Sequence, residues 1–259
     1  MSFWDLLFLA VIQGIAEFLP ISSSGHLVLA AHWLGIHEAT GTLTIMLHAG
    51  TLLSILVFYF SRILSLVKED RKVIPLLVVG TLPAGVVGIL LKRNFESLLE
   101  NPWVAASMLL VTGGILMATR FIPSRVGSDY RHASYRTALF VGFFQAFAIL
   151  PGISRSGSTI FAGHWIGLSR ESAATFSFLL AIPVILGATL LEIKDLWGQE
   201  GAGSVGAPML ILGATISFGV GYVSLVWLVA FIQKGKFHLF AWWCIPFGLV
   251  TLLILSFSS

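Results

Sequence analysis

Residues 13–35 read QGIAEFLPISSSGHLVLAAHWLG, and residues 145–167 read QAFAILPGISRSGSTIFAGHWIG. When one stretch is laid over the other at a shift of 132, ten of the 23 positions are identical, including the glutamine, two serines, the histidine, the tryptophan and two glycines. A shared apolar composition does not explain matches of these residue types. The sequence therefore predicts a tandem duplication, with repeats over residues 1–131 and 132–259 in a single domain.

The composition of the chain places it in a membrane. The 259 residues are 57% hydrophobic and 10% charged, and the mean hydropathy is +0.94. Soluble domains carry about 25% charged residues, so this chain has too few charges to cover a water-facing surface. A soluble enzyme and a disordered chain are excluded, and the single cysteine excludes a disulfide scaffold. The net charge of +3 comes without a basic run, so no nucleic-acid partner is expected.

Six apolar segments are long enough to cross a bilayer, which takes about 20 residues as a helix. Two further apolar regions, 3–36 and 137–168, are interrupted by polar turns at 20–25 and 151–157. Their halves are mostly too short to cross and are typical of re-entrant hairpins, whose tips must be buried in protein or line a cavity. The expected fold is an all-α integral membrane protein with an inverted-topology repeat, each half a re-entrant helical hairpin plus three transmembrane helices. The six predicted spans are 43–60, 74–91, 103–121, 173–191, 208–231 and 239–257.

An odd number of spans in each repeat turns the second repeat upside down relative to the first, and the basic residues agree with this topology. Eleven Lys and Arg residues fall on one predicted side and three on the other, and an excess of basic residues marks the cytoplasmic side. Both termini are therefore expected outside the cytoplasm. The eleven are Arg62, Lys68, Arg71, Lys72, Arg120, Arg125, Arg131, Arg136, Arg170, Lys234 and Lys236, and the three are Lys92, Arg93 and Lys194.

The first hairpin tip carries an acid and a histidine around a serine-rich turn. Gln13 and Glu17 are four residues apart and share one helix face, and an ionisable residue at membrane depth is functional by default. The alternative for Glu17 is a structural ion pair with Arg155. Ser22–Gly25 are expected to form the turn, and their N–H groups at the start of the next helix favour an anion. His26 then lies in the first turn of that helix, where a reacting role competes with a structural one.

The second tip, residues 151–159, repeats the serine turn with an arginine inserted. A guanidinium binds phosphate oxygens with two parallel hydrogen bonds, so Arg155 among hydroxyls and glycines is typical of a phosphate or carboxylate clamp. A structural salt bridge is the alternative. In the alignment Glu17 and His26 are matched by Ile149 and Ser158. One tip is therefore expected to supply the acid and base groups, and the other the cation.

Other repeated features are expected to support the architecture. The His-Trp-x-Gly segments at 32–35 and 164–167 occur in both halves, and the glycine of each is expected to permit close helix packing. The same packing role is expected of glycines 80, 85, 88, 213, 219 and 221. No role is assigned to His37, His48, His132 or His238.

The two tips resemble the signature regions of the undecaprenyl-diphosphate phosphatase family of the bacitracin-resistance type. The first family signature is Glu or Gln, three residues, Glu, a serine-rich turn and Gly-His, which residues 13–26 match with Gln at position 13. The second is Pro-Gly-x-Ser-Arg-Ser-Gly, which residues 151–157 match. The resemblance extends over essentially the whole chain.

The resemblance implies a bacterial plasma-membrane enzyme that removes the terminal phosphate of undecaprenyl diphosphate, mainly at the outer face, and so recycles a lipid carrier for cell-wall synthesis. It also implies a divalent cation, Mg²⁺ or Ca²⁺, to which Glu17 and the neutral oxygen of Gln13 are the expected ligands. The expected partners are a polyprenyl diphosphate and membrane lipid, and the oligomeric state, a homodimer included, is left open. The catalytic candidates are Glu17, His26, Arg155, Ser22, Ser23 and Ser154, and the substrate-binding candidates are Gln13, Ser24, Gly25, Gly152, Ser156, Gly157 and Thr159.

Several alternatives remain at this stage. The nucleophile is expected to be His26, with Ser22, Ser23 or Ser154 as its rival. Type-2 phosphatidic acid phosphatases share a Ser-Gly-His and a Ser-Arg, but they need a His-x-x-x-Asp, whereas the residue four positions after His164 is Leu168 here. A Ser-His protease does not account for Arg155. A lipid-carrier flippase without hydrolytic activity is the main alternative function, because inverted repeats are also transporter features.

Overall fold

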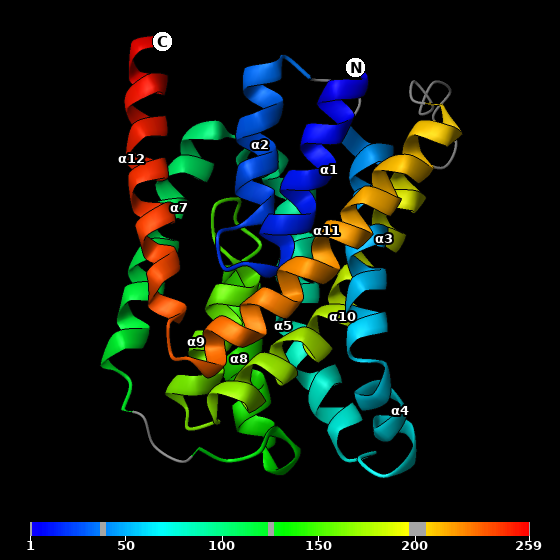
Figure 1. The fold of residues 1–259 in the computed structure, drawn as a ribbon, viewed down its shortest axis with the longest axis vertical. Helices are drawn as coiled ribbons and strands as arrows, with labels where there is room; N and C mark the ends of the chain where they lie inside the picture. Colours follow the sequence, from blue (N-terminus) through cyan, green and yellow to red (C-terminus); the bar gives the residue numbers. More distant parts are fainter. Residues whose placement is uncertain (1, 37–39, 124–126, 197–205, 259) are drawn as a thin grey trace.

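The computed structural model describes residues 2–36, 40–123, 127–196 and 206–258, and within these ranges every regular element is helical apart from one isolated bridge between Ser128 and Leu168. Figure 1 shows the helices side by side, with both chain ends at the top. Arg125 and His37 lie outside the described residues. The elements are α1 Phe3–Phe18, α2 Ser23–Leu34, α3 Thr40–Phe58, α4 Phe60–Lys68, α5 Val73–Asn94, α6 Glu96–Leu99, α7 Pro102–Ala118, η1 Thr119–Phe121, η2 Tyr130–His132, α8 Tyr135–Phe147, α9 Arg155–Trp165, α10 Arg170–Leu196, α11 Ala207–Gln233, η3 Phe237–Phe240 and α12 Ala241–Ser258.

The predicted spans are present. Five helical segments are long and apolar enough to cross a membrane, namely Val73–Asn94, Pro102–Phe121, Arg170–Lys194, Ala207–Gln233 and Phe237–Phe257. The sixth predicted span, 43–60, corresponds to α3, which together with α4 passes the same test as a bent pair. The expectation of an all-α, multi-pass membrane protein is therefore confirmed.

The bend between α3 and α4 was not expected from the sequence. The chain turns by 68° at Tyr59 and continues as α4 to Lys68. Phe60, Leu64 and Val67 are exposed and share one face of α4 because they recur at helical spacing. An apolar face of this kind suits a helix that lies in the membrane interface. Helix α4 therefore begins where the predicted span 43–60 ends and runs in a different direction.

The two interrupted regions form helix pairs, α1 with α2 and α8 with α9. In Figure 1 the α1–α2 pair lies in the upper half of the molecule and the α8–α9 pair in the lower half, and their connecting turns meet near the centre. The first turn is shorter than predicted, because α2 already begins at Ser23. The Ser22 hydroxyl accepts the N–H of Gly25 at 3.2 Å and caps the helix. A serine cap lets the chain enter the helix at once.

The core lies between the helices, and the outer surface is apolar. Phe18, Phe176 and Phe178 are fully buried at the centre, whereas Trp227, Trp242 and many other large apolar side chains are exposed. A soluble protein rarely exposes contiguous apolar surface of this extent. The exposed apolar side chains are therefore placed to contact lipid.

The packing role expected of six glycines is confirmed for most of them. At Gly80, Gly213 and Gly221 a Cβ atom would come within about 3 Å of a neighbouring helix, and at Gly88 it would make ordinary contact at 3.6 Å. Gly85 and Gly219 have no such neighbour within 4 Å in the described part of the chain, and for these two the prediction is wrong. A helical spacing of glycines does not by itself distinguish a face that meets protein from one that meets lipid.

Candidate functional site

The two turns touch through their glycines. A Cβ atom at Gly25 would lie 2.7 Å from the Cα of Gly152, and one at Gly157 would lie 3.3 Å from the Cβ of Pro20. Gly152 itself has φ +92°, a conformation that glycine adopts at no steric cost. Thr112 of α7 fixes this second turn, because its hydroxyl donates to the carbonyl of Gly152 at 2.7 Å and accepts the N–H of Ser154 at 2.9 Å. The backbones of the two tips are thus in direct contact.

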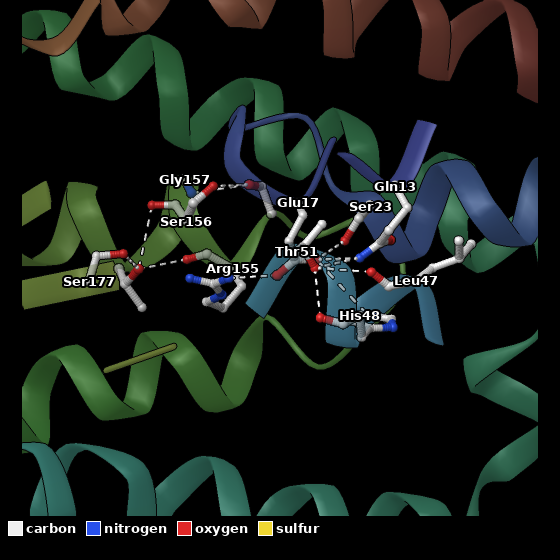
Figure 2. Close-up of polar contacts among 12 residues, drawn as sticks. Gln13, Glu17, Ser23, Leu47, His48, Thr51, Arg155, Ser156, Gly157 and Ser177 are labelled. Carbon is white, nitrogen blue, oxygen red and sulfur yellow. Dashed lines mark hydrogen bonds and ion pairs between the residues drawn. The ribbon is translucent and has the colours of Figure 1, made fainter. Parts of the chain in front are cut away.

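An ion pair joins the two tips. The Nη2 of Arg155, at the start of α9, donates to Oε1 of Glu17, near the end of α1, at 2.6 Å (Figure 2). Relative exposure of the two side chains is 14% for Arg155 and 7% for Glu17. Removing one member of a buried pair leaves the other charge unpaired, which costs about 3–5 kcal/mol. The pair that the sequence analysis named as the structural alternative is therefore present.

The second carboxylate oxygen of Glu17 collects three further polar groups. The hydroxyl of Ser23 donates to Oε2 at 2.7 Å, and the amide of Gln13 donates at 3.1 Å. The Nε2 of His48, on α3, lies 3.9 Å from the same oxygen. Figure 2 shows these side chains converging on the carboxylate from α1, α2 and α3. The carboxylate of Glu17 thus has four polar neighbours: an arginine, a serine, a glutamine amide and a histidine.

Helix α3 contributes two polar side chains, His48 and Thr51, to the cluster. The amide of Gln13 also reaches Thr51 Oγ1 at 3.5 Å, and the Thr51 hydroxyl donates to the carbonyl of His48 at 3.0 Å. The Nδ1 of His48 lies 2.8 Å from the carbonyl of Thr44. A carbonyl can only accept, so Nδ1 carries the proton and Nε2 is the nitrogen that faces Glu17.

Two buried polar atoms at the centre of the cluster have no hydrogen-bond partner in the part of the chain that the structure describes. They are Oε1 of Gln13 and Nη1 of Arg155. Buried polar atoms are nearly always hydrogen-bonded, so an unpaired one requires an explanation. One unused acceptor and one unused donor beside an ion pair are what a polar ligand would satisfy.

His26 faces a different set of neighbours. Its Nδ1 lies 2.8 Å from the carbonyl of Ser22, and its Nε2 accepts the indole N–H of Trp243 at 3.0 Å. Its ring stacks on Phe247 with centroids 4.8 Å apart and planes at 2°. Both ring nitrogens are therefore engaged, Nδ1 by the cap of α2 and Nε2 by Trp243 of α12. The structure places His26 at the same tip as Glu17 but within an aromatic stack.

The remaining predicted residues belong to the capping of α2 and α9. Ser154 caps α9 by accepting the N–H of Gly157 at 3.1 Å, as Ser22 does for α2. The Ser154 and Ser156 hydroxyls lie 3.2 Å apart, and those of Ser22 and Ser24 lie 3.4 Å apart. Thr159 is buried against Ser177 of α10, with their hydroxyls 2.6 Å apart. These groups line or support the two turns.

Comparison with known proteins identifies the family of the chain. The family model of bacitracin resistance protein BacA matches residues 6–250. The chain belongs to the BacA family. It is 52% identical over 246 residues to an undecaprenyl-diphosphatase of Rhodopirellula baltica, with 95% of each chain covered. Undecaprenyl-diphosphatases of Desulfatibacillum aliphaticivorans and Halothermothrix orenii are each 38% identical, over 99% and 98% of this chain and 100% and 98% of their own.

Sequence reasoning missed three neighbours of the tips in this BacA-family chain. His48 received no role, although the criterion applied to Glu17, an ionisable residue at membrane depth, applies to it as well. Thr51 follows His48 by three residues and so lies on the same face of α3. Trp243 lies 217 residues from its partner His26, and no local pattern connects the two.

The repeated His-Trp-x-Gly segments end helices. Gly35 has φ +64° and caps α2, and Gly167 has φ +105° just after α9. Among the residues that the structure describes, a Cβ atom at either glycine would meet no neighbour within 4 Å, so the expectation that they permit close helix packing is wrong. Glycine recurs here because a helix commonly ends on a residue with positive φ.

Proposed function

We propose that the chain hydrolyses undecaprenyl diphosphate to undecaprenyl phosphate and inorganic phosphate. The relatives that bear the name undecaprenyl-diphosphatase match it over nearly their whole length. The observation that carries the proposal is the Arg155–Glu17 pair at the junction of the two turns, because it places a phosphate-binding cation beside a carboxylate at a water-poor site. The lipid product keeps one phosphate and can serve again as a carrier in envelope polymer synthesis.

The proposed architecture is an inverted repeat, 1–131 and 132–259, with two re-entrant hairpins. Helix α1 packs on α11 and α8 packs on α5, and these two contacts are equivalent when the halves are exchanged. Helix α7 packs on α12, which is its own counterpart in the other half. The two hairpins also approach the centre from opposite ends (Figure 1). Inverted repeats of this type carry their polar site near the midplane.

The proposed location is the bacterial inner membrane, with both termini and the opening of the active site at the outer face. The termini lie at one end of the molecule in Figure 1. The opposite end holds the α4–α5 connection and the α11–η3 connection, which carry Lys68, Arg71, Lys72, Lys234 and Lys236. An excess of basic residues at that end supports a cytoplasmic assignment.

In the proposed mechanism Arg155 binds the terminal phosphate. Its Nη2 holds Glu17 while its Nη1 is buried and unpaired, so one guanidinium can contact a phosphate oxygen without releasing the carboxylate. The helices α2 and α9 also direct their N-terminal N–H groups, the positive ends of the helix dipoles, toward the same phosphate. Electrostatic stabilisation and positioning account for most of phosphoryl-transfer catalysis.

The geometry favours Ser23 as the nucleophile over His26. The Ser23 hydroxyl already donates to Oε2 of Glu17 at 2.7 Å, so the carboxylate can take its proton as the oxygen attacks. A bond forms from Ser23 Oγ to the terminal phosphorus, and the bond from phosphorus to the bridging oxygen breaks to release the lipid monophosphate. Water then hydrolyses the phosphoserine. Attack by His26 requires that Nε2 first lose the hydrogen bond that it accepts from the indole N–H of Trp243.

The site fits a divalent cation whose ligands come from both the protein and the substrate. No group of three His, Cys, Asp or Glu side chains that could hold a metal occurs in the ranges that the structure describes. The unpaired Oε1 of Gln13 and the carboxylate of Glu17 are nevertheless oxygen donors of the kind that Mg²⁺ and Ca²⁺ prefer. Mg²⁺ is commonly held by one or two carboxylates together with substrate phosphates. When bound, the ion would neutralise charge on the diphosphate, with Gln13 and Glu17 as its protein ligands.

Phosphate release by the purified protein in detergent tests the function. Micelles have no second compartment, so release of phosphate from a polyprenyl diphosphate requires hydrolysis, whereas a flippase releases none. A parallel reaction with chelator and added Mg²⁺ or Ca²⁺ tests the cation. Absence of phosphate release with and without either ion would contradict the proposal.

Mapping a trapped phosphoenzyme decides the nucleophile. Acid-stable phosphate on the peptide that contains Ser23 is expected. Acid-labile phosphate on His26 would overturn the assignment to Ser23 and leave the hydrolytic function intact.

A further inference from the structure

A cavity lies beside the second half of α9, away from the turn at which that helix begins. It has a volume of about 110 Å³ and lies between the η1 end of α7, the last turn of α9, the start of α10 and η3. In Figure 1 these segments are at the bottom of the molecule, opposite the chain termini. A cavity needs only about 10–15 Å³ of such volume to hold one water, so this one accepts a group as large as a phosphate.

The polar lining of the cavity is basic in composition. Arg120, Arg170, His164 and His238 contribute to it, and none of its described lining residues is acidic. Gly235 also lines it with φ +68°, and a Cβ atom there would lie 2.6 Å from Nη1 of Arg170. The missing side chain leaves room for the guanidinium in the cavity wall.

His164 presents an unsatisfied nitrogen at this place. Its Nδ1 lies 3.0 Å from the carbonyl of Leu168 and therefore carries a proton. Its Nε2 is buried and has no hydrogen-bond partner among the residues that the structure describes. Nε2 is then a hydrogen-bond acceptor, and a buried acceptor of this kind calls for a donor, which the hydroxyl of a singly protonated phosphate group supplies.

Helix ends explain part of this cluster but not the cavity. Cations are favourable near helix C-termini, which accounts for Arg120 after α7 and His164 in the last turn of α9. That effect needs neither an open volume nor a buried nitrogen without a partner. The lining also includes Phe161 and Phe237, so the site offers apolar surface beside its cations.

We propose that this cavity is a second anion site, which binds the phosphate group of an amphiphile at the end of the molecule opposite the termini. Arg120 and Arg170 neutralise the phosphate, the hydroxyl of the phosphate group donates to His164 Nε2, and Phe161 and Phe237 contact the attached chain. The site is separate from the Arg155–Glu17 pair and does not depend on the proposed hydrolysis. A lipid headgroup and free phosphate share this chemistry.

Equilibrium binding of radiolabelled farnesyl monophosphate to the purified protein in detergent tests the proposal. The wild type is expected to bind at two sites, and Arg155→Ala at one. Arg120→Gln and His164→Leu are each expected to weaken the site that remains in Arg155→Ala by about tenfold, since a hydrogen bond to a charged group is lost. His32→Leu is the matched control, because His32 aligns with His164 in the repeat but is exposed.

Competition separates the sources of the phosphate group. Displacement by inorganic phosphate at equal affinity identifies free phosphate as the ligand, and displacement by phosphatidylglycerol identifies a general lipid headgroup. Resistance to both identifies a polyprenyl phosphate.

Two outcomes would overturn the proposal, provided that the variants melt at the wild-type temperature. One is unchanged binding in both Arg120→Gln and His164→Leu. The other is a single site in the wild type that Arg155→Ala abolishes.

Discussion

At the first tip Ser22 caps α2 by accepting the N–H of Gly25, and at the second Ser154 caps α9 by accepting the N–H of Gly157. The serine two residues later lies within 3.4 Å of the capping hydroxyl at the first tip and 3.2 Å at the second. The matched serines and glycines of the two tips therefore have the same contacts in the structure, and these contacts build a turn and a helix start.

Positions that differ between the tips hold the charges. Glu17 aligns with Ile149, and Ser23 aligns with Arg155, so the carboxylate and the guanidinium come from different places in the repeat. Even the matched Gln13 and Gln145 have different partners, since Gln13 donates to Glu17 and Gln145 donates to the carbonyl of Gly80. The comparison teaches that the shared scaffold positions two turns and that the differences between them create the site.

Loss of the arginine is expected to have the largest effect. Arg155→Ala removes the phosphate-binding cation, and phosphate release should fall by at least about 10²–10³-fold, as for removal of other preorganised donors. The variant should also be less stable, because Glu17 keeps a buried charge without its partner. Ile149→Ala, at the position that aligns with Glu17, is the control and should keep its activity. Near-normal turnover of Arg155→Ala would remove this residue from the site.

Loss of the Ser23 hydroxyl is expected to come next. Ser23→Ala should reduce phosphate release by about 10²-fold or more, since attack and proton transfer to Glu17 both need this oxygen. Its thermal unfolding temperature in detergent should stay close to that of the wild type, because Ser23 is not a capping residue. Full activity in Ser23→Ala together with an inactive His26→Ala would instead favour the histidine.

A methyl group at the junction of the turns should lower stability. Gly152→Ala places a side chain at φ +92° and against the carbonyl oxygen of Ala105. Strain and overpacking together should cost at least about 2 kcal/mol of unfolding free energy, measured by denaturation in detergent. Gly167→Ala is the control, because it has a similar φ of +105° but open space around it. Equal losses in the two variants would mean that strain alone, and not the contact between tip and α7, sets the cost.

The smallest effect should separate the two caps. Ser22 has φ +71°, which is costly for a side-chain-bearing residue, whereas Ser154 has φ −74°. Glycine is only a few tenths of a kcal/mol worse than serine as a cap, so Ser22→Gly should be neutral or stabilising and Ser154→Gly mildly destabilising. Thermal unfolding of the two variants measures the difference. The reverse order would show that the positive φ of Ser22 carries no strain.

The sequence predicts the fold and the location of the site, but not the contacts between helices that complete the site. Hydropathy places the spans because burial in lipid imposes a minimum apolar length, and the repeat points to the two tips. Tertiary contacts are harder to infer: His48 and Trp243 reach Glu17 and His26 from α3 and α12, and no spacing within a helix encodes such a meeting. The sequence does not reveal the role of the glycine at the end of α2, because glycine serves both packing and helix termination. The φ angle that distinguishes the two uses is set by the folded chain.

The ion pair between the tips also has a consequence during synthesis. Glu17 leaves the ribosome 138 residues before Arg155. At about 5–20 residues per second, this interval lasts roughly 7–28 s. An unpaired carboxylate is costly in the bilayer core, so the first hairpin has to keep Glu17 in contact with water, or neutralised, until the second hairpin arrives. The order in which the halves are made thus determines when the first hairpin can settle at its final depth.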